Sequence, residues 1–303
     1  MGLRTLRKKL SRYKIKNYLE DKAIDKAYKD ACADFRQRHV QTNKIHAVVV
    51  HLFHVENLPL FKSKLKYLQT VHKFDLFITC PEQNISFIKD LKKNFPDAEY
   101  LVCPNKGRDV LPFIMIAKIL SEWNYQTVLK FHSKKSTHWD GGQTWLEKTL
   151  DQIIPVNEQS LHEIVRVITN SQTGVVGPSE FYYPLTVNFP ANGAHMSDFV
   201  IKHYGKENER YYLQTHRSDY GFYGGTMLWM RINAIEKLLT STPRDFEPEA
   251  GQIDGTYAHA VERLLCLLPQ IENRTNYECD GQKVSIRQYK TNNIPEWSID
   301  HDK

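Results

Sequence analysis

The sequence predicts an α/β fold, a mostly parallel sheet flanked by helices, with a basic helical arm at the N-terminus. From residue 45 onward, short β-branched or apolar runs alternate with helical patterns, which is typical of βαβ units. Before residue 45, Lys and Arg outnumber Asp and Glu by 13 to 5, whereas the remainder holds 28 against 30. We therefore expect an arm over residues 1–44, a domain over residues 45–290 and a polar tail over residues 291–303.

The arm is predicted to contain an amphipathic basic helix. Met1–Lys16 carries seven basic residues and no acidic one, while Leu3, Leu6, Leu10 and Tyr13 recur every third or fourth residue. Such a helix can attach to an anionic membrane surface, where each Lys or Arg contributes about 1 kcal/mol. The alternative is a solvated helix packed on the domain or on a second subunit. Nucleic acid is not an expected partner, since the segment lacks interleaved aromatic and basic residues.

Composition indicates a globular chain. Hydrophobic residues make up 41% of the 303 residues and charged residues 25%, and no apolar run reaches the 18 or so residues of a spanning helix. No secretory signal is recognised at the N-terminus. The five cysteines are odd in number and scattered, so neither a disulfide framework nor a zinc site is indicated. We expect a cytoplasmic protein, peripheral on the inner face of the cell membrane.

The elements of the first half of the domain are regular. Strands are predicted at residues 46–53, 74–80, 99–103 and 127–132, with helices at 58–72, 83–94 and 110–123 between them, the first capped by Asn57. The second half is less regular. There we expect helices at 143–154 and 158–169, a strand at 175–178, a loop-like stretch at 179–193, an aromatic segment at 220–231, a helix from 233, an acidic loop at 246–254 and a helix at 255–268.

Ligands of parallel sheets bind beyond the carboxyl ends of the strands, and two polar clusters fall there. Asn105-Lys106-Gly107-Arg108-Asp109 joins a strand to a helix, and its free N–H groups and Arg108 suit a diphosphate or a sugar. A helix capped by Asp109 with a surface arginine is the structural alternative. Lys130–Ser136 ends another strand and offers cations for phosphate oxygens, or else a loop of solvated lysines.

A third cluster, residues 246–255, is acidic. Asp254 precedes a helix and could cap it, or could accept a proton from an attacking hydroxyl. Glu262 and Arg263, further along that helix, are interpreted as structural partners. P-loop, dinucleotide-binding, zincin and α/β-hydrolase motifs are absent from the sequence, and D-x-D occurs once, at Asp300-His301-Asp302 in the tail.

Taken together, five ordered blocks resemble the rhamnan synthesis protein F family over about residues 46–270. The blocks are Asn105–Asp109, Leu129–Ser136, Trp145, Gly224–Arg231 and Gly251–Arg263. The resemblance implies a glycosyltransferase of cell-surface polysaccharide synthesis (O-antigen, capsule or rhamnan), a nucleotide-sugar donor and a lipid-linked saccharide acceptor. The order of elements is also similar to that of GT-A-type (Rossmann-like) inverting glycosyltransferases, which implies a GT-A-like fold.

Laid on that pattern, the residues take expected roles. Asp254 occupies the place of the catalytic base of a single displacement with inversion. His132-Ser133-Lys134 occupies the place of the metal-binding D-x-D, so a divalent metal (Mg or Mn) is possible but not predicted, and no metal-ligating residue is assigned. Donor binding is assigned to Asn105, Gly107, Arg108, Asp109, His132, Lys134 and Lys135, and acceptor binding to Gly224, Gly225 and Trp229.

Core packing of Trp229 is the alternative to its acceptor role. Two other classes of function stay open: a non-catalytic adaptor of a polysaccharide assembly complex, and a hydrolase that uses Glu247, Glu249 and Asp254 as its carboxylates.

Overall fold

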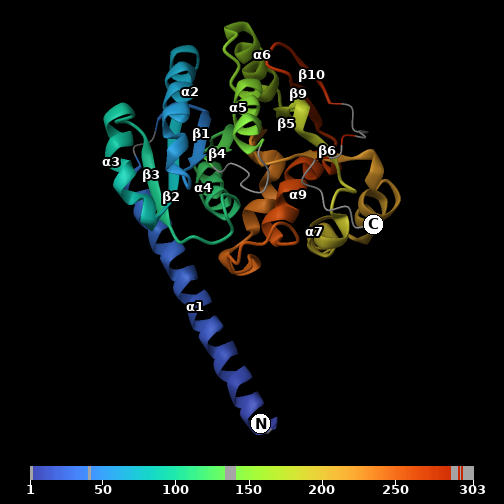
Figure 1. The fold of residues 1–303 in the computed structure, drawn as a ribbon. Helices are drawn as coiled ribbons and strands as arrows, with labels where there is room; N and C mark the ends of the chain where they lie inside the picture. The colour runs from blue at the N-terminus through green and yellow to red at the C-terminus, as the bar shows by residue number, and fades with distance from the viewer. Residues whose placement is uncertain (1–2, 40–41, 134–140, 288–292, 294, 296–303) are drawn as a thin grey trace.

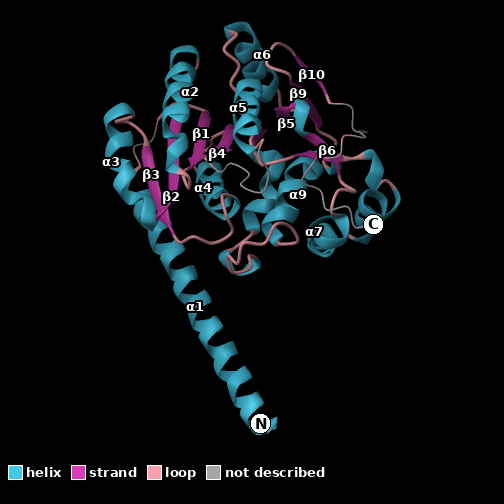
Figure 2. Cartoon of the chain, in the orientation of Figure 1, coloured by secondary structure: helices cyan, strands magenta, loops and turns pink. Residues whose placement is uncertain are grey.

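The structure is a computed structural model that describes residues 3–39, 42–133, 141–287, 293 and 295, with side chains from Leu19 onward. Lys134, Lys135 and nearly all of the predicted tail lie outside the described residues. The expected α/β class is confirmed, because eight strands form one mixed, mostly parallel sheet between helices (Figure 2).

The sheet has the strand order β10-β9-β5-β8-β4-β1-β2-β3. Strands β1 to β4 run parallel to one another, and β8 enters antiparallel between β4 and β5. A separate pair joins β6 to β7. The strands are β1 (His46–His51), β2 (Asp75–Pro81), β3 (Glu99–Cys103), β4 (Thr127–His132), β5 (Thr173–Pro178), β6 (Tyr182–Pro184), β7 (Gly221–Tyr223), β8 (Leu228–Arg231), β9 (Thr275–Cys279) and β10 (Val284–Ile286).

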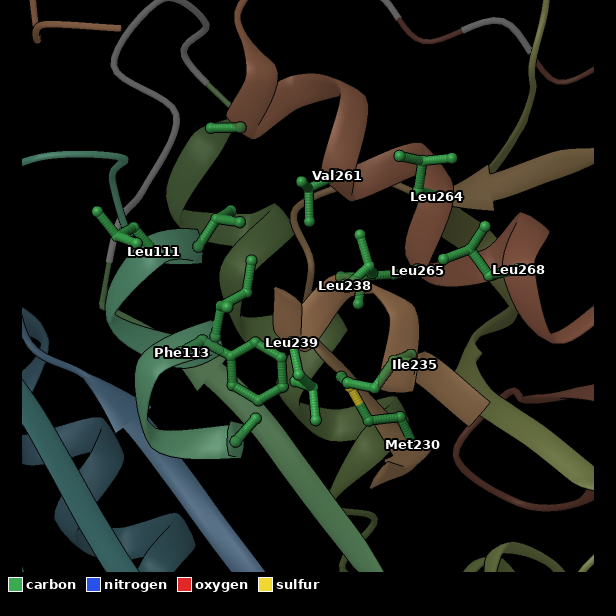
Figure 3. Close-up of a cluster of buried hydrophobic side chains, with 14 of the residues drawn as sticks. Leu111, Phe113, Met230, Ile235, Leu238, Leu239, Val261, Leu264, Leu265 and Leu268 are labelled. Carbon is green, nitrogen blue, oxygen red and sulfur yellow. The ribbon is translucent and has the colours of Figure 1, made fainter. Parts of the chain in front are cut away.

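Helices cover both faces of the sheet. The α-helices are α1 (Leu3–Arg38), α2 (Leu58–Val71), α3 (Ile85–Asn94), α4 (Val110–Glu122), α5 (Gly142–Ile153), α6 (Glu158–Thr169), α7 (Phe189–Tyr204), α8 (Lys206–Glu209) and α9 (Tyr257–Ile271), and η6 (Ile232–Thr240) is a 3-10 helix. Alternate side chains of β1 enter two separate apolar cores, as the pleat requires. One core lies under α4, α7, α9 and η6, and Figure 3 shows part of it. The other lies under α2, α3, α5 and α6.

Helix α1 runs without a break for 36 residues and extends away from the sheet (Figure 1). The absence of Pro and Gly from its sequence permits this length. Its second half packs on the domain, because Tyr28, Cys32 and Phe35 are buried in the first core and Phe35 stacks on Trp123. None of the helices among the described residues is long and apolar enough to cross a bilayer.

The second half of the chain departs from the prediction. The stretch expected to be loop-like, residues 179–193, contains β6 and the start of α7. Its tyrosines pair with β7, about 40 residues away, and Pro190 lies in the first helical turn, where no N–H is needed. Strands β9 and β10 were not predicted, since their polar residues break the apolar pattern of a buried strand.

Asn57 is the N-cap residue of α2, as predicted, but its side chain makes no capping bond. Its amide instead donates to the carbonyl of Ser133, at 3.0 Å, because the carboxyl end of β4 lies beside it.

Candidate functional site

The candidate site lies at the carboxyl ends of β1 and β4. The chain passes from β1 to β2 and β3 on one side and then crosses back to β4 on the other side of β1. Open α/β sheets bind their ligands at such a reversal of strand order. The antiparallel strand β8 begins at the same edge, so the residues before it, Gly224–Thr226, join the site.

A buried ion pair forms the centre of the site. Lys130, on β4, donates to the Asp109 carboxylate at 2.5 Å and to the Thr226 hydroxyl at 2.6 Å, and that hydroxyl donates to Asp109 at 2.7 Å. The side chain of Lys130 is 1% exposed and that of Asp109 is 9% exposed. Thr226 has a φ of +56°, which is costly for a β-branched residue and is held here by these bonds.

Gly225 connects this pair to α9. Its carbonyl accepts a hydrogen bond from His132 Nε2 at 2.6 Å, and its N–H donates to the Glu262 carboxylate. Its φ of +89° favours glycine, and a Cβ would lie 2.3 Å from the ring of Trp145. His132 Nε2 is also 3.9 Å from the Asp109 carboxylate. Asp109, His132 and Glu262 therefore all lie around the Gly225 turn.

Burial and neighbouring charges act in opposite directions on the pKa of Asp109. Burial opposes ionisation of Asp109, but the charges of Lys130 and His132 outweigh it and hold the pKa of that carboxyl well below its usual range. His51, at the end of β1, donates or accepts a hydrogen bond with Thr79 at 2.8 Å. Burial lowers the pKa of His51 to about 3, so His51 is neutral at pH 7.

The loop before α4 has the tight turn that its sequence predicts, since Gly107 and Arg108 have φ values of +66° and +56°. The Arg108 N–H donates to Glu249 at 3.0 Å, and its guanidinium donates to the carbonyl of Gln252. Arg108 therefore ties this loop to the acidic loop, and Asn105 is exposed. Asp109 was expected to cap α4; it makes no capping bond because its carboxylate is committed to Lys130.

Asp254 is enclosed by hydrogen-bond donors. One carboxylate oxygen accepts from Asn188 at 2.7 Å and from Arg263 at 3.1 Å. The other accepts from Asn192 at 2.8 Å and from the N–H of Gly255 at 2.8 Å. The side chain is 6% exposed. Asp254 thus joins the start of α7 to the start of α9, and Arg263 fills the structural role expected of it.

The two carboxylates on this side of the site titrate differently. Burial raises the pKa of Asp254, but the charges of Arg263 and His259 and the bonds to the asparagines outweigh it, and its pKa is lowered. Burial raises the pKa of Glu262, and the neighbouring Arg263 offsets only part of that. Because Arg263 lies 3.6 Å from Glu262 and 3.1 Å from Asp254, the base predicted from the sequence is linked to the Gly225 turn.

The three acidic residues of the hydrolase alternative have separate partners. Glu247 accepts from the N–H of Tyr257 and lies 3.2 Å from His195. Glu249 accepts from Arg108, and Asp254 lies in the network described above. No three His, Cys, Asp or Glu side chains in the described part of the chain are gathered as a metal ion would need.

The structure brings some predicted residues together and separates others. Asp109, His132 and Gly225 form one cluster, and Asp254 adjoins it. Trp229 is fully buried in the second core, where its indole N–H donates to the carbonyl of Ile153 at 2.8 Å. It faces the side of the sheet opposite Lys130, because neighbouring residues of a strand alternate and Trp229 pairs with Leu129. Its expected acceptor role is therefore corrected to core packing.

Sequence reasoning missed three further polar residues. Thr226 was within a quoted block but was given no role, and Asn188 and Asn192 fell in the stretch expected to be loop-like. The alternation of Lys130 and His132 on one strand was a usable signal, since it put both on the side that faces α4. Gly224 packs against the ring of Tyr183, where a Cβ would lie 2.7 Å from that ring.

Fold and site together define an α/β protein whose candidate site lies at the switch point of a sheet with helices on both faces. The sequence profile of the rhamnan synthesis protein F family matches residues 12–274, and the chain belongs to that family. The match begins within the arm, before the range over which the resemblance was recognised.

Two proteins recorded as "Uncharacterized protein WxcX" are similar to this chain. They come from Xanthomonas campestris pv. campestris, strains B100 and ATCC 33913. Each is 34% identical over 186 residues, which is 60% of this chain and 25% of the relative. The chain therefore spans about a quarter of the length of these relatives.

Proposed function

We propose that this protein is an inverting glycosyltransferase that moves a sugar from a nucleotide-diphosphate donor to a growing cell-surface polysaccharide. The observation that carries the proposal is the buried cluster of Asp109, Lys130 and Thr226 at the switch point. Burying such a pair is costly, and a strained threonine beside it adds to the cost. A binding or catalytic function at this edge of the sheet accounts for the buried ion pair and for the strained threonine. Membership of a polysaccharide-synthesis family supports sugar transfer as that function.

In the proposed reaction the acceptor hydroxyl attacks the anomeric carbon of the donor. The new C–O bond forms as the bond to the diphosphate breaks, the diphosphate leaves with the bonding electrons, and a carboxylate takes the hydroxyl proton. Asp254 is the predicted base and is ionised at neutral pH. Glu262 is the second candidate, because its raised pKa makes it the better proton acceptor and it borders the Gly225 turn.

Donor binding is assigned to the loops that meet at this edge. Asp109 and His132 belong to the cluster, Arg108, Gly107 and Asn105 form the turn before α4, and Lys134 and Lys135 follow β4 in the sequence. Fixed cations can stabilise a leaving diphosphate in place of a metal ion. We therefore propose metal-independent transfer to a lipid-linked saccharide on the cytoplasmic side of the membrane.

Nucleotide binding is the first test, because it needs no acceptor. The purified chain is heated with dTDP, UDP, GDP or CMP, with and without Mg and Mn, and a ligand that binds the native state raises the melting temperature. Stabilisation by one nucleoside diphosphate without metal is expected, and Lys134→Ala should weaken it. A strict requirement for Mg or Mn contradicts metal independence. No stabilisation by any nucleotide contradicts the transferase and favours the adaptor.

The base is identified by a comparison of four variants. Asp254→Asn should reduce transfer by about 10² to 10⁴ while nucleotide binding persists. Because Asp254 also holds α7 to α9, Asn188→Ala and Asn192→Ala serve as controls that loosen the same contact and leave the carboxylate in place. If these controls lose as much transfer as Asp254→Asn, the residue is structural. Loss of transfer in Glu262→Gln alone moves the base to Glu262.

A further inference from the structure

Helix α1 contacts both loops of the candidate site. The hydroxyl of Tyr28 donates to the carbonyls of Pro104 and Lys106, at 2.9 and 3.2 Å, and Asp21 accepts from the ammonium group of Lys106 at 2.8 Å. These bonds hold the start of the loop that leads to Asp109.

A second contact of α1 reaches the other loop. Asp25 accepts from Arg244 at 2.5 Å, two residues before the acidic loop that begins at Phe246. Tyr28 is 1% exposed, Lys106 3% and Asp25 8%, whereas the side chains of their partners Asp21 and Arg244 are 46% and 67% exposed. The backbone of Arg108 and the carboxylate of Glu249 join the two loops to each other. The middle of α1 is therefore part of the frame that positions the site.

The first half of α1 is basic and, unlike the second half, lies away from the domain. It extends beyond the domain (Figure 1), and its sequence from Met1 to Lys16 carries seven basic residues and no acidic one. At a rise of 1.5 Å per residue, Leu3 is about 27 Å along the helix axis from Asp21. Because the helix is unbroken, whatever binds its first half also fixes the orientation of the second half and of the loops held there.

We infer that α1 couples an anionic lipid surface to the candidate site, with its first half bound to lipid headgroups and Asp21, Asp25 and Tyr28 acting as positioning residues for the two loops. Charge selects this partner, since a basic helix with recurring apolar residues lies in the interface of an anionic bilayer. The family profile matches from residue 12, so the part of the helix that positions the loops lies within the matched range. Lipid binding is expected to restrain α1 and, through it, the loops.

The test measures amide hydrogen exchange in residues 104–111 and 243–256 of the full chain, together with co-sedimentation. The vesicles contain phosphatidylcholine with phosphatidylglycerol, or phosphatidylcholine alone. We expect the chain to pellet with the anionic vesicles only, and exchange in both loops to slow about fivefold or more. Reversal of charge by Lys8→Glu, Lys9→Glu and Arg12→Glu together should abolish both effects.

Tyr28→Phe separates coupling from lipid binding. This variant should still pellet with anionic vesicles, but its loops should show no slowing. Asp21→Asn gives the same readout without altering a core side chain, because the Asp21 side chain is 46% exposed. Tyr67→Phe is the matched control, since it also removes a tyrosine hydroxyl bonded to a backbone carbonyl, that of Val156, and should behave like the parent chain.

The other outcomes decide separately on the coupling, on the lipid partner and on the proposed function. Pelleting without slower exchange in the parent chain overturns the coupling. Failure to pellet, or concentration-dependent dimerisation that the charge reversal abolishes, overturns the lipid surface as the partner. The readout requires no nucleotide. A chain that shows both effects but binds no nucleoside diphosphate therefore retains the role of α1 and loses the proposed function.

Discussion

Breaking the buried ion pair of Asp109 and Lys130 should destabilise the protein more than any exposed pair does. Asp109→Asn leaves a buried ammonium group without its counter-charge and with only neutral acceptors, and Lys130→Met leaves a buried carboxylate without a cation. Removing one partner of a buried pair costs about 3–5 kcal/mol, whereas replacing both is often nearly neutral. The double variant should therefore cost no more than either single variant, which is a coupling of at least about 3 kcal/mol.

Urea unfolding at pH 7.5, followed by circular dichroism, measures these costs as shifts in midpoint at constant slope. Glu163→Gln is the control, because it breaks a pair with Arg166 whose side chains are 38% and 72% exposed. That substitution should change the free energy of unfolding by less than about 0.5 kcal/mol. A loss below about 1 kcal/mol for Asp109→Asn would refute the reasoning, since it would mean that water reaches Lys130.

Three further predictions concern stability. Burial lowers the pKa of His51 to about 3 and that of His72 to about 4, so the unfolded state takes up protons below pH 6.5 and the folded state does not. Stability should be full above pH 6.5 and fall by about 2 kcal/mol at pH 5 through His51, with a smaller loss through the half-buried His72, and equal urea midpoints at pH 7.5 and 5 would contradict this. Gly225→Ala should destabilise more than Gly251→Ala, because both have positive φ but only the first places a Cβ against a ring; equal losses of melting temperature would argue against that contact. Trp229→Phe should lower the melting temperature without changing transfer, and lost transfer at unchanged stability would restore its acceptor role.

The first half of the domain could be predicted from the sequence because its elements are local. Strands β1 to β4 are apolar runs buried on both faces, and the helices between them repeat apolar residues with helical spacing. The place of strand β8 in the sheet could not be predicted from the sequence. It lies beside β4, although about 100 residues separate the two in the chain, and no local pattern encodes that pairing.

Contacts between residues far apart in the chain also decided the roles of site residues. Sequence reasoning placed Asp109 at the start of α4 correctly, but it gave the carboxylate either to a bound donor or, as the alternative, to the local N–H groups of the helix, and not to a distant lysine. Lys130 lies 21 residues away and Thr226 lies 117 residues away, yet they bind that carboxylate in preference. A charged partner in a buried place gives a stronger bond than a helix cap, so tertiary contacts decided the role of the residue.

The charges of the described site bear directly on how a diphosphate could bind. The carboxylates of Asp109, Asp254 and Glu262 lie beside Lys130 and Arg263, and two histidines, His132 and His259, lie 3.9 and 3.8 Å from Asp109 and Asp254. The lysine and the arginine each already contact a carboxylate, and neither is available to a second anion without leaving its partner. A diphosphate therefore requires added positive charge, and the sequence offers it in the lysines at 134 and 135, directly after His132 and Ser133. A divalent ion could supply the same charge. Restoration of nucleotide binding by Mg in a chain that lacks both lysines would therefore mean that the lysines act by their charge alone, whereas its failure would mean that a divalent ion cannot replace them.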